Sequence, residues 1–154
     1  MAGVIVRPAV ADDRAFIEDL GRRTVLASLS AVRVAPAPLL EASFERLLQI
    51  VTGRSYVGLI AQDGPTRVGF ALMLDTLPDE VTGLEQGFIA YMAVEPARRR
   101  EGAGAALLKA AEDEARKRGL PHVSLMVTQA NAAARALYER AGYVTERRLL
   151  CKQL

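Results

Sequence analysis

The chain has 154 residues, of which 51% are apolar, and its 20 basic and 18 acidic side chains give a net charge of +2. This length and composition predict one folded domain over residues 1–154 and exclude an intrinsically disordered chain. The small net charge, the absence of tryptophan and an aromatic content of 5% argue against a nucleic-acid-binding surface.

The cysteine, histidine and hydropathy patterns exclude further classes. Cys151 is the sole cysteine, so no internal disulfide is expected. His122 is the sole histidine, and no set of metal ligands can be built around it, so we expect no metal site. No apolar run approaches about 18 residues and no signal peptide opens the chain, which predicts a cytoplasmic protein without membrane contact.

The N-terminal third predicts a strand followed by two helices. Val4–Arg7 has the pattern of a short strand, and a helix begins near Ala11–Asp13, with Gly21 interrupting or ending its first section. The proline-containing stretch 31–38 predicts a loop. Apolar residues at helical spacing over 39–51 then predict a second helix.

The middle of the chain predicts three strands. Residues 56–62 and 68–75 flank an Asp-Gly-Pro turn and predict a hairpin. Residues 77–87 contain proline, glycine and acidic residues, which favour an exposed loop. The apolar run 88–94 predicts a buried strand.

The C-terminal third alternates helices and strands. Its patterns predict helices over 105–118 and 131–140, each followed by a glycine, and strands over 122–128 and 143–151, the last of them antiparallel. The complete predicted order is βααβββαβαβ.

The most informative segment is Arg99-Arg100-Glu101-Gly102-Ala103-Gly104, which lies between the strand 88–94 and the helix 105–118. The backbone N–H groups at a helix start lack partners, and the helix dipole adds partial positive charge there, so this segment predicts a cradle for a pyrophosphate. A Rossmann fingerprint needs a third glycine where this chain has Leu107, and a Walker loop needs a Gly-Lys-Ser/Thr sequence that is absent.

Two motifs together resemble those of the GNAT superfamily of N-acetyltransferases. The first is the Arg-x-x-Gly-x-Gly pattern at 99–104, which follows a strand ending in Ala-Val-Glu-Pro. The second is Asn131-Ala-Ala-Ala-Arg-Ala-Leu-Tyr-Glu-Arg-Ala-Gly-Tyr143, which is similar to the family's Asn-x-x-Ala-x-x-Leu-Tyr-x-x-x-Gly-Phe/Tyr block. This resemblance covers roughly residues 87–145.

The resemblance implies an α/β (α+β) GNAT fold. In that fold a mixed, mostly antiparallel sheet of six to seven strands carries four helices on both faces, and the fourth and fifth strands are splayed apart. It also implies acetyl-CoA as the cofactor, with the pantetheine arm lying in the splay. The residues that match the family's cofactor contacts are Met92, Ala93, Val94, Arg99, Arg100, Glu101, Gly102, Ala103, Gly104 and Asn131.

Two of these residues carry a second interpretation or a conflict. Asn131 is also a natural helix N-cap, and both roles are compatible. Glu101 stands where the family more often has a basic or small residue, so its side chain has to turn away from the phosphates or it weakens affinity. Residues 91–94 taken alone fit a plain core strand, and the attached loop favours the cofactor role for them.

The resemblance implies that Tyr138 donates a proton to the departing thiolate, because a phenol with a pKa near 10 stays protonated at neutral pH. The alternative is a core tyrosine. Glu85 is our candidate for the base that deprotonates the amine, against the alternative of a loop acid facing water, because Phe88 stands where some relatives carry a glutamate.

The predicted reaction is direct acetyl transfer from acetyl-CoA to a primary amine of a small molecule or of a protein or peptide. The alternatives are a non-catalytic acyl-CoA-binding sensor or regulatory module and a nucleotide-binding structural protein. The resemblance implies that the acceptor binds near the first two helices and the loops 31–38 and 77–87. The apolar residues 32–38 suggest a partly apolar pocket or a partner surface there, and Arg22, Arg23 and Arg33 could attract an acidic acceptor. Many relatives are homodimers, which this chain's pattern allows but does not specify.

Overall fold

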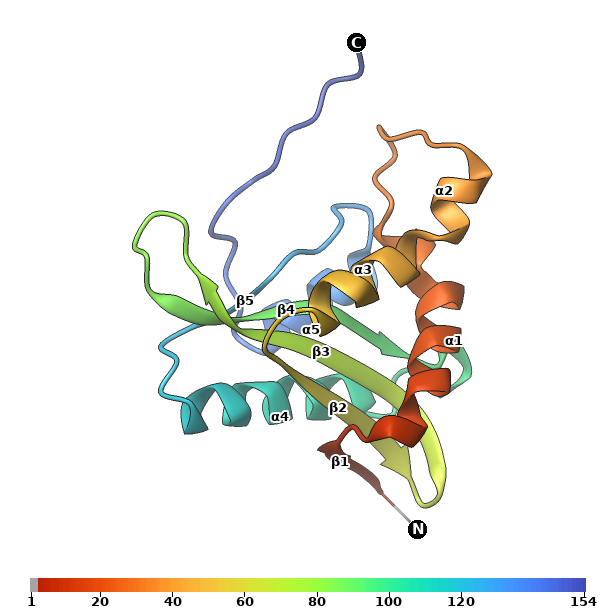
Figure 1. Cartoon of the computed structure of the whole chain (residues 1–154), viewed down its shortest axis with the longest axis vertical. Coiled ribbons are helices and arrows are strands. Elements are labelled where there is room, and N and C mark those ends of the chain that lie inside the picture. Colours follow the sequence, from red (N-terminus) through yellow and green to blue (C-terminus); the bar gives the residue numbers. More distant parts are fainter. Residues whose placement is uncertain (1–2) are drawn as a thin grey trace.

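The computed structural model describes residues 3–154 and contains a single mixed sheet in this range, with its strands in chain order (Figure 1). Neighbouring strands are antiparallel from β1 to β4, and β5 is parallel to β4. The strands are β1 (Val4–Pro8), β2 (Tyr56–Asp63), β3 (Thr66–Pro78), β4 (Glu85–Val94) and β5 (Val123–Leu125).

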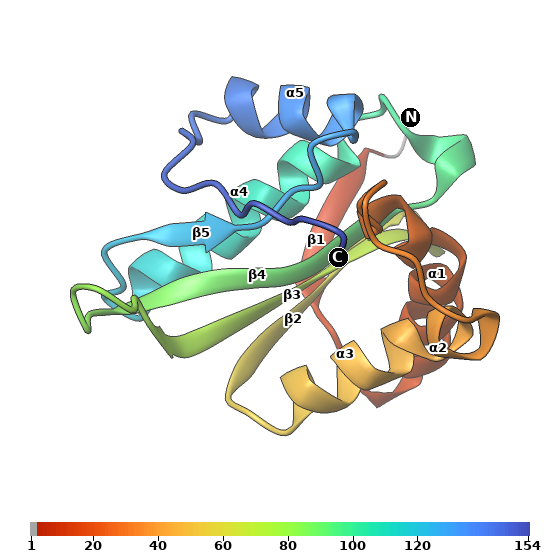
Figure 2. The ribbon, with the colours of Figure 1, turned by 90° about the horizontal axis from the view of Figure 1, so that it is seen from above.

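Helices cover both faces of this sheet. Figure 2 shows α4 and α5 on one side and α1 to α3 on the other. The α-helices are α1 (Arg14–Thr24), α2 (Ala37–Glu41), α3 (Ser43–Thr52), α4 (Ala103–Lys117) and α5 (Ala132–Arg140), and short 3₁₀ turns are η1 (Ala11–Asp13), η2 (Val25–Ser28) and η3 (Pro96–Arg98). No helix within residues 3–154 combines the length and the apolarity needed to cross a bilayer.

Each face has its own hydrophobic core. The α4-side core joins the inner face of α4 to the sheet; its residues include Leu59, Met73, Ile89, Leu107, Leu108 and Ala111. The α1-side core joins α1 and α3 to the opposite face; its residues include Leu20, Phe44, Leu48, Phe70, Leu72 and Tyr91. Burial of these apolar side chains is what holds the helices to the sheet.

Gly21 does not interrupt the first helix, contrary to the sequence prediction. Helix α1 continues through it to Thr24. A Cβ atom at Gly21 would lie 2.2 Å from the ring of Phe44, so the glycine is needed for close packing of α3 against α1. The ring of Phe44 is fully buried as a result.

The sheet and helix counts also differ from the prediction of six to seven strands and four helices. Residues 3–154 contain five strands and five α-helices, in the order βαααβββαβα. The predicted helix over 39–51 is divided at Ala42 into α2 and α3, and α2 begins after Pro36, at the end of the predicted loop. The strand count is lower because residues 143–151 form no strand. Strands β3 and β4 are longer than predicted, and the loop between them shrinks to residues 79–84.

The predicted last strand over 143–151 is wrong, since these residues have no regular secondary structure. Strand β5 has only three residues, so it offers a short edge for a further strand to pair with. Without such an edge, the backbone N–H and C=O groups of a strand would lack hydrogen-bond partners. Several apolar side chains of this segment are exposed, among them Val144, Leu149 and Leu150.

Strand β4 contains an irregularity that changes which face its side chains occupy. Its register against β3 shifts between the pairs Leu72–Tyr91 and Met73–Ile89. Ile89 belongs to the α4-side core, whereas Ala90 and Tyr91 both pack on the α1 side. Two successive residues on one face are the signature of a β-bulge.

Candidate active site

The segment that we call the anion loop, Arg99–Gly104, leads from the end of β4 and η3 into α4. Gly102 precedes the helix with φ of 89°, in the left-handed region that favours glycine. Arg100 has φ of 67°. These two left-handed residues turn the chain sharply before the first turn of α4.

The backbone N–H groups from Glu101 to Ala105 have no hydrogen-bond partner within residues 3–154. The first N–H of this segment with a partner is that of Ala106, which donates to the Gly102 carbonyl at 3.0 Å. No side chain caps this helix start. The segment therefore presents several donors and the positive end of the α4 dipole at one place, as an anion site requires.

Charge around the anion loop is divided between paired and unpaired arginines. Arg98 bonds to the carboxylates of Asp63 and Glu101, both at 2.6 Å, and these acids raise its pKa. Glu101 is thus drawn to Arg98. Arg99 and Arg100 form no ion pair with any residue in 3–154, so their charge is available to a phosphate.

Gly104 faces helix α5, and not the open space that the prediction of a phosphate cradle implies. A Cβ atom there would lie 3.0 Å from Leu137 Cδ2 on α5. The glycine therefore lets α5 pack closely over the start of α4. A larger side chain at 104 would press on this helix contact.

Strand β4 is paired with β5 only over Gly87–Ile89, and the two strands diverge beyond it (Figure 2). We call Ala90–Val94 the open half of β4. The Glu95 N–H donates to the Val68 carbonyl at 2.8 Å, so by antiparallel alternation Ala93 also faces β3. Met92 and Val94 direct their N–H and C=O groups away from β3, toward the side that β5 has left. The β-bulge at Ala90–Tyr91 determines which residues of the open half direct their peptide groups outward.

Asn131 caps helix α5, as its position in the sequence predicts. Its side-chain oxygen accepts from the Ala134 N–H at 3.1 Å. Just before it, the Thr128 hydroxyl donates to the Ser28 carbonyl at 2.7 Å, which ties the segment after β5 to η2. This contact lies beyond Leu125, where the pairing of β5 with β4 ends.

Tyr138 lies on α5, half-buried against the α4-side core and edge-to-face with Tyr143 at 6.1 Å between ring centroids. Its hydroxyl has no hydrogen-bond partner within residues 3–154, while that of Tyr143 donates to Glu112 at 3.1 Å. Burial raises the pKa of Tyr138, and the nearby Tyr91 raises it further. Tyr138 is therefore a neutral phenol with a free proton.

Tyr91 is a site feature that sequence reasoning treated as core. Its hydroxyl lies 2.7 Å from Thr24 Oγ1 at the end of α1. Burial raises the pKa of Tyr91, and the hydrogen bond with Thr24 and the charge of Arg99 in the anion loop oppose this rise only in part. The open half of β4, the anion loop, α1 and α5 thus meet around Tyr91 and Tyr138. No pattern in the sequence predicts the bulge that places Tyr91 on the α1 side.

Glu85 is not brought together with these groups. It begins β4 opposite Pro78 and is exposed. Six residues separate it from Tyr91, or about 20 Å along the strand. Ser124 donates to the neighbouring Gln86 at 2.8 Å, across the paired half of β4 and β5.

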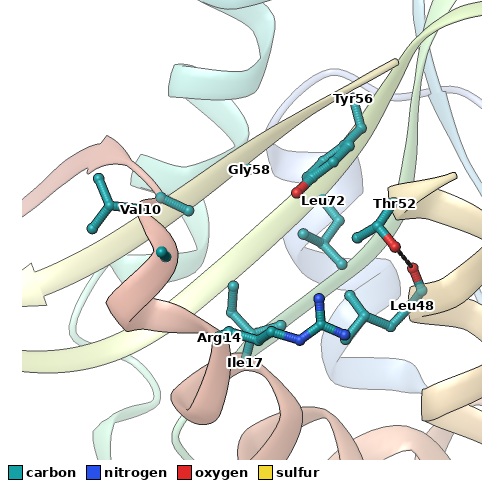
Figure 3. Close-up of a pocket in the computed structure, with 10 residues that line it drawn as sticks. Val10, Arg14, Ile17, Leu48, Thr52, Tyr56, Gly58 and Leu72 are labelled. Atoms are coloured by element: carbon teal, nitrogen blue, oxygen red, sulfur yellow. Dashed lines mark hydrogen bonds between the residues drawn. The ribbon is translucent and has the colours of Figure 1, made fainter. Parts of the chain in front are cut away.

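Two cavities lie outside this cluster. One, of about 330 Å³, lies between α1, α3 and the start of β2, with Tyr56 and Arg14 at its sides (Figure 3). The other, of about 370 Å³, is lined by Leu29, Val32, Arg33, Val34, Ala35, Cys151, Lys152 and Gln153. No group of three potential metal ligands occurs within residues 3–154.

Residues 27–143 match the model of the Acetyltransferase (GNAT) family. Over 89 residues the chain is 38% identical to mycothiol acetyltransferase of Beutenbergia cavernae, covering 58% of this chain and 28% of that protein. Over 60 residues it is 43% identical to the [ribosomal protein bS18]-alanine N-acetyltransferase of Escherichia coli K12, covering 39% of this chain and 40% of that protein.

The chain therefore matches well under half of the length of either curated relative. A solved structure, a putative acetyl transferase from Pyrococcus furiosus, superimposes with a TM-score of 0.84 at 21% identity, over 98% of this chain and 99% of that one. This likeness gives the fold. The family model covers most of the chain, and the chain belongs to the GNAT acetyltransferase family.

Proposed function

We propose that this protein is an acetyl-CoA-dependent N-acetyltransferase that transfers the acetyl group directly to a primary amine of a small molecule or of a protein or peptide. The main structural support is the arrangement at the start of α4. Unpartnered N–H groups there stand next to the open half of β4, and Tyr138 packs against the same core as Met92 and Val94 of that strand.

The cofactor would lie along these two features. The N–H groups of Glu101 to Gly104 suit the pyrophosphate, and Arg99 and Arg100 suit its charge or that of the 3′-phosphate. The pantetheine arm carries two amides, and the outward peptide groups of Met92 and Val94 offer matching donors and acceptors. The other predicted contacts, Ala93 and Asn131, support this arrangement through β3 and the α5 cap.

The chemistry is an attack of a neutral amine on the thioester carbonyl carbon. A C–N bond forms, the C–S bond breaks, and the sulfur leaves as a thiolate that needs a proton. The half-buried hydroxyl of Tyr138 supports this role because it has no other partner and its pKa is raised by burial, so it keeps its proton at neutral pH.

The amine also has to lose a proton, since a primary amine has a pKa near 10.4 and is charged at pH 7. Glu85 remains our candidate base. Its distance along β4 from Tyr91 requires that the proton pass through water.

The acceptor would approach from the side of α1 and η2. The curated relatives are named for mycothiol and for an alanine of the ribosomal protein bS18. In this chain the cavity beside η2 and α2 has apolar walls and two basic residues, Arg33 and Lys152, with no acid among its lining residues. That lining supports an amine carried by an uncharged or anionic molecule over a polycation.

The proposal is tested by measuring CoA thiol release from acetyl-CoA across a panel of amines. The panel contains peptides that begin with alanine, cysteinyl amines, an aminoglycoside and spermine. We expect acetyl-CoA to bind and at least one amine to release CoA well above hydrolysis. Tight binding of acetyl-CoA without release by any amine would favour the non-catalytic sensor. A preference for ATP or NAD over CoA would contradict both.

A further inference from the structure

We propose that the hydroxyl of Tyr91, held by Thr24, is the group that binds and orients the attacking amine. The inference rests on the proposed function and adds to it a residue on the opposite side of the sheet from Tyr138. Its basis is the direction of the hydrogen bonds around this hydroxyl.

The ring of Tyr91 has little freedom to move. It stacks on Phe70 with 5.8 Å between ring centroids and meets Phe44 edge-on at 5.1 Å. The residue is 9% exposed. Because the ring is fixed by this packing, the hydroxyl occupies a defined position, as a group that orients a substrate has to.

The proton of each hydroxyl can be assigned from the partners. Thr24 Oγ1 lies 2.7 Å from the Leu20 carbonyl oxygen, which can only accept, so the single hydroxyl proton of Thr24 is given to that oxygen. The 2.7 Å contact between Thr24 and Tyr91 then requires Tyr91 to be the donor. The Tyr91 oxygen is left with lone pairs and no proton to offer, so a substrate group that binds it must be a donor, as an amine N–H is.

The position of Tyr91 agrees with this role. Tyr91 packs in the α1-side core and Tyr138 against the α4-side core, on the two faces of the sheet. Tyr91 belongs to the open half of β4, and its neighbour Met92 packs against the same core as Tyr138. The nucleophile and the leaving sulfur bond to the same carbon, so groups that serve them have to be neighbours approached from different sides.

The test compares Tyr91→Phe and Thr24→Val with the control Tyr143→Phe, which also removes a phenol hydroxyl but one that faces Glu112. The amine is whichever member of the panel above gives the highest rate, and its concentration is varied at saturating acetyl-CoA. Binding of CoA is measured separately by calorimetry. Both site variants keep side chains of nearly native shape.

We expect Tyr91→Phe to lower kcat/KM for the amine about tenfold, mostly through KM, with the Kd of CoA unchanged. Thr24→Val frees the Tyr91 hydroxyl to rotate, so it should act on the same parameter. The double variant should be no worse than Tyr91→Phe alone, because both substitutions remove one interaction. The control should match the wild type.

Three results would overturn the inference. They are an unchanged kcat/KM in Tyr91→Phe, a loss in CoA affinity in place of amine affinity, or additive effects in the double variant. If Tyr91→Phe fails to fold, Thr24→Val decides the question by the same two measurements. A wild-type protein that binds acetyl-CoA but releases no CoA with any amine would overturn the proposed function and this inference together.

Discussion

The two faces of the sheet present two kinds of binding surface. On the α4 side, the candidate cofactor groups are mostly main-chain amides, and they come from two short segments, the anion loop and the open half of β4. On the α1 side, the groups are side chains, Tyr91 and Thr24, which lie 67 residues apart in the sequence. A surface made of backbone depends on turn and strand geometry. A surface made of side chains depends on tertiary packing.

The largest expected effect is on the rate of the chemical step, to which the α4 side contributes Tyr138. Tyr138→Phe removes the proposed proton donor and should lower kcat by about 10²- to 10⁴-fold while the Kd of CoA stays the same. Rapid-quench measurement of acetyl transfer separates the chemical step from product release. An unchanged rate for that step would remove Tyr138 from the mechanism, and Tyr143→Phe serves as the matched control.

The next effect concerns stability on the α1 side, away from both candidate surfaces. The carboxylate of Asp13 is fully buried and accepts from Arg7 at 2.7 and 2.8 Å, from Arg67 at 2.7 Å and from the Val10 N–H at 2.7 Å. Asp13→Asn should lower the free energy of unfolding by about 2–3 kcal/mol, because the neutral amide loses the charge-assisted hydrogen bonds and places an NH₂ donor against the guanidinium donors of Arg7 and Arg67. Urea unfolding at pH 7 measures this loss.

The same carboxylate predicts a pH dependence. Its hydrogen bonds with Arg7 hold the pKa of Asp13 well below the usual value. The stabilisation is therefore complete above the unfolded-state pKa, near 3.9, and is lost as the pH falls toward the folded-state pKa. Asp13→Asn should lack this dependence, and Asp12→Asn, at the exposed neighbouring position, should retain it. Equal acid sensitivity of the two variants would contradict the assignment.

A smaller effect is expected at the anion loop. Gly102→Val forces a β-branched residue into a left-handed conformation at φ of 89°, although a Cβ atom there would meet no other atom within 4 Å. The loop should move and the Kd of CoA should rise about tenfold, since the donors are then misaligned. Calorimetry with CoA checks this, and the control is Gly119→Val beyond the other end of α4, where φ is 69° and a Cβ atom likewise meets no atom within 4 Å. An unaltered Kd would mean that the amides do not hold the phosphates.

The smallest effect is expected for Glu85→Gln, because this side chain is far along β4 and would act through water. The rate should fall about two- to fivefold below pH 7 and recover at high pH, where the amine is neutral without help. A pH–rate profile from 6 to 10 measures it. A parallel drop at every pH would indicate a structural role, and no drop would assign the base elsewhere.

The sequence predicted the α4 side better than the α1 side, for a physical reason. Glycines, a basic loop and a helix start are local signals, so the anion loop and the cap at Asn131 could be placed without the fold. The bulge at Ala90–Tyr91 leaves no such signal, because an apolar run looks the same with or without an extra residue. Gly21 was misread for a related reason, since its role depends on a ring 23 residues away.

The prediction of a strand over 143–151 was wrong because a strand also needs a neighbouring strand to pair with, and local sequence preference does not show whether one is present. Arg147 is instead held by Asp79 and Glu80 of the loop between β3 and β4, which no spacing rule would pair with it. The Asp79 carboxylate also accepts from Thr82 and Val81, and these bonds lower its pKa to about 2. The C-terminal segment is therefore attached to this charged loop through Arg147, whereas its sequence pattern had predicted a strand of the sheet.

The extra residue in β4 lets one strand contribute main-chain groups to one candidate binding surface and an aromatic side chain to the other. Upstream of it, alternate side chains serve one core. Downstream, the alternation is inverted, so peptide groups turn outward on one side while an aromatic ring turns inward on the other. Acceptor preference can therefore diversify through side chains on one surface while the main chain that meets the cofactor is left alone.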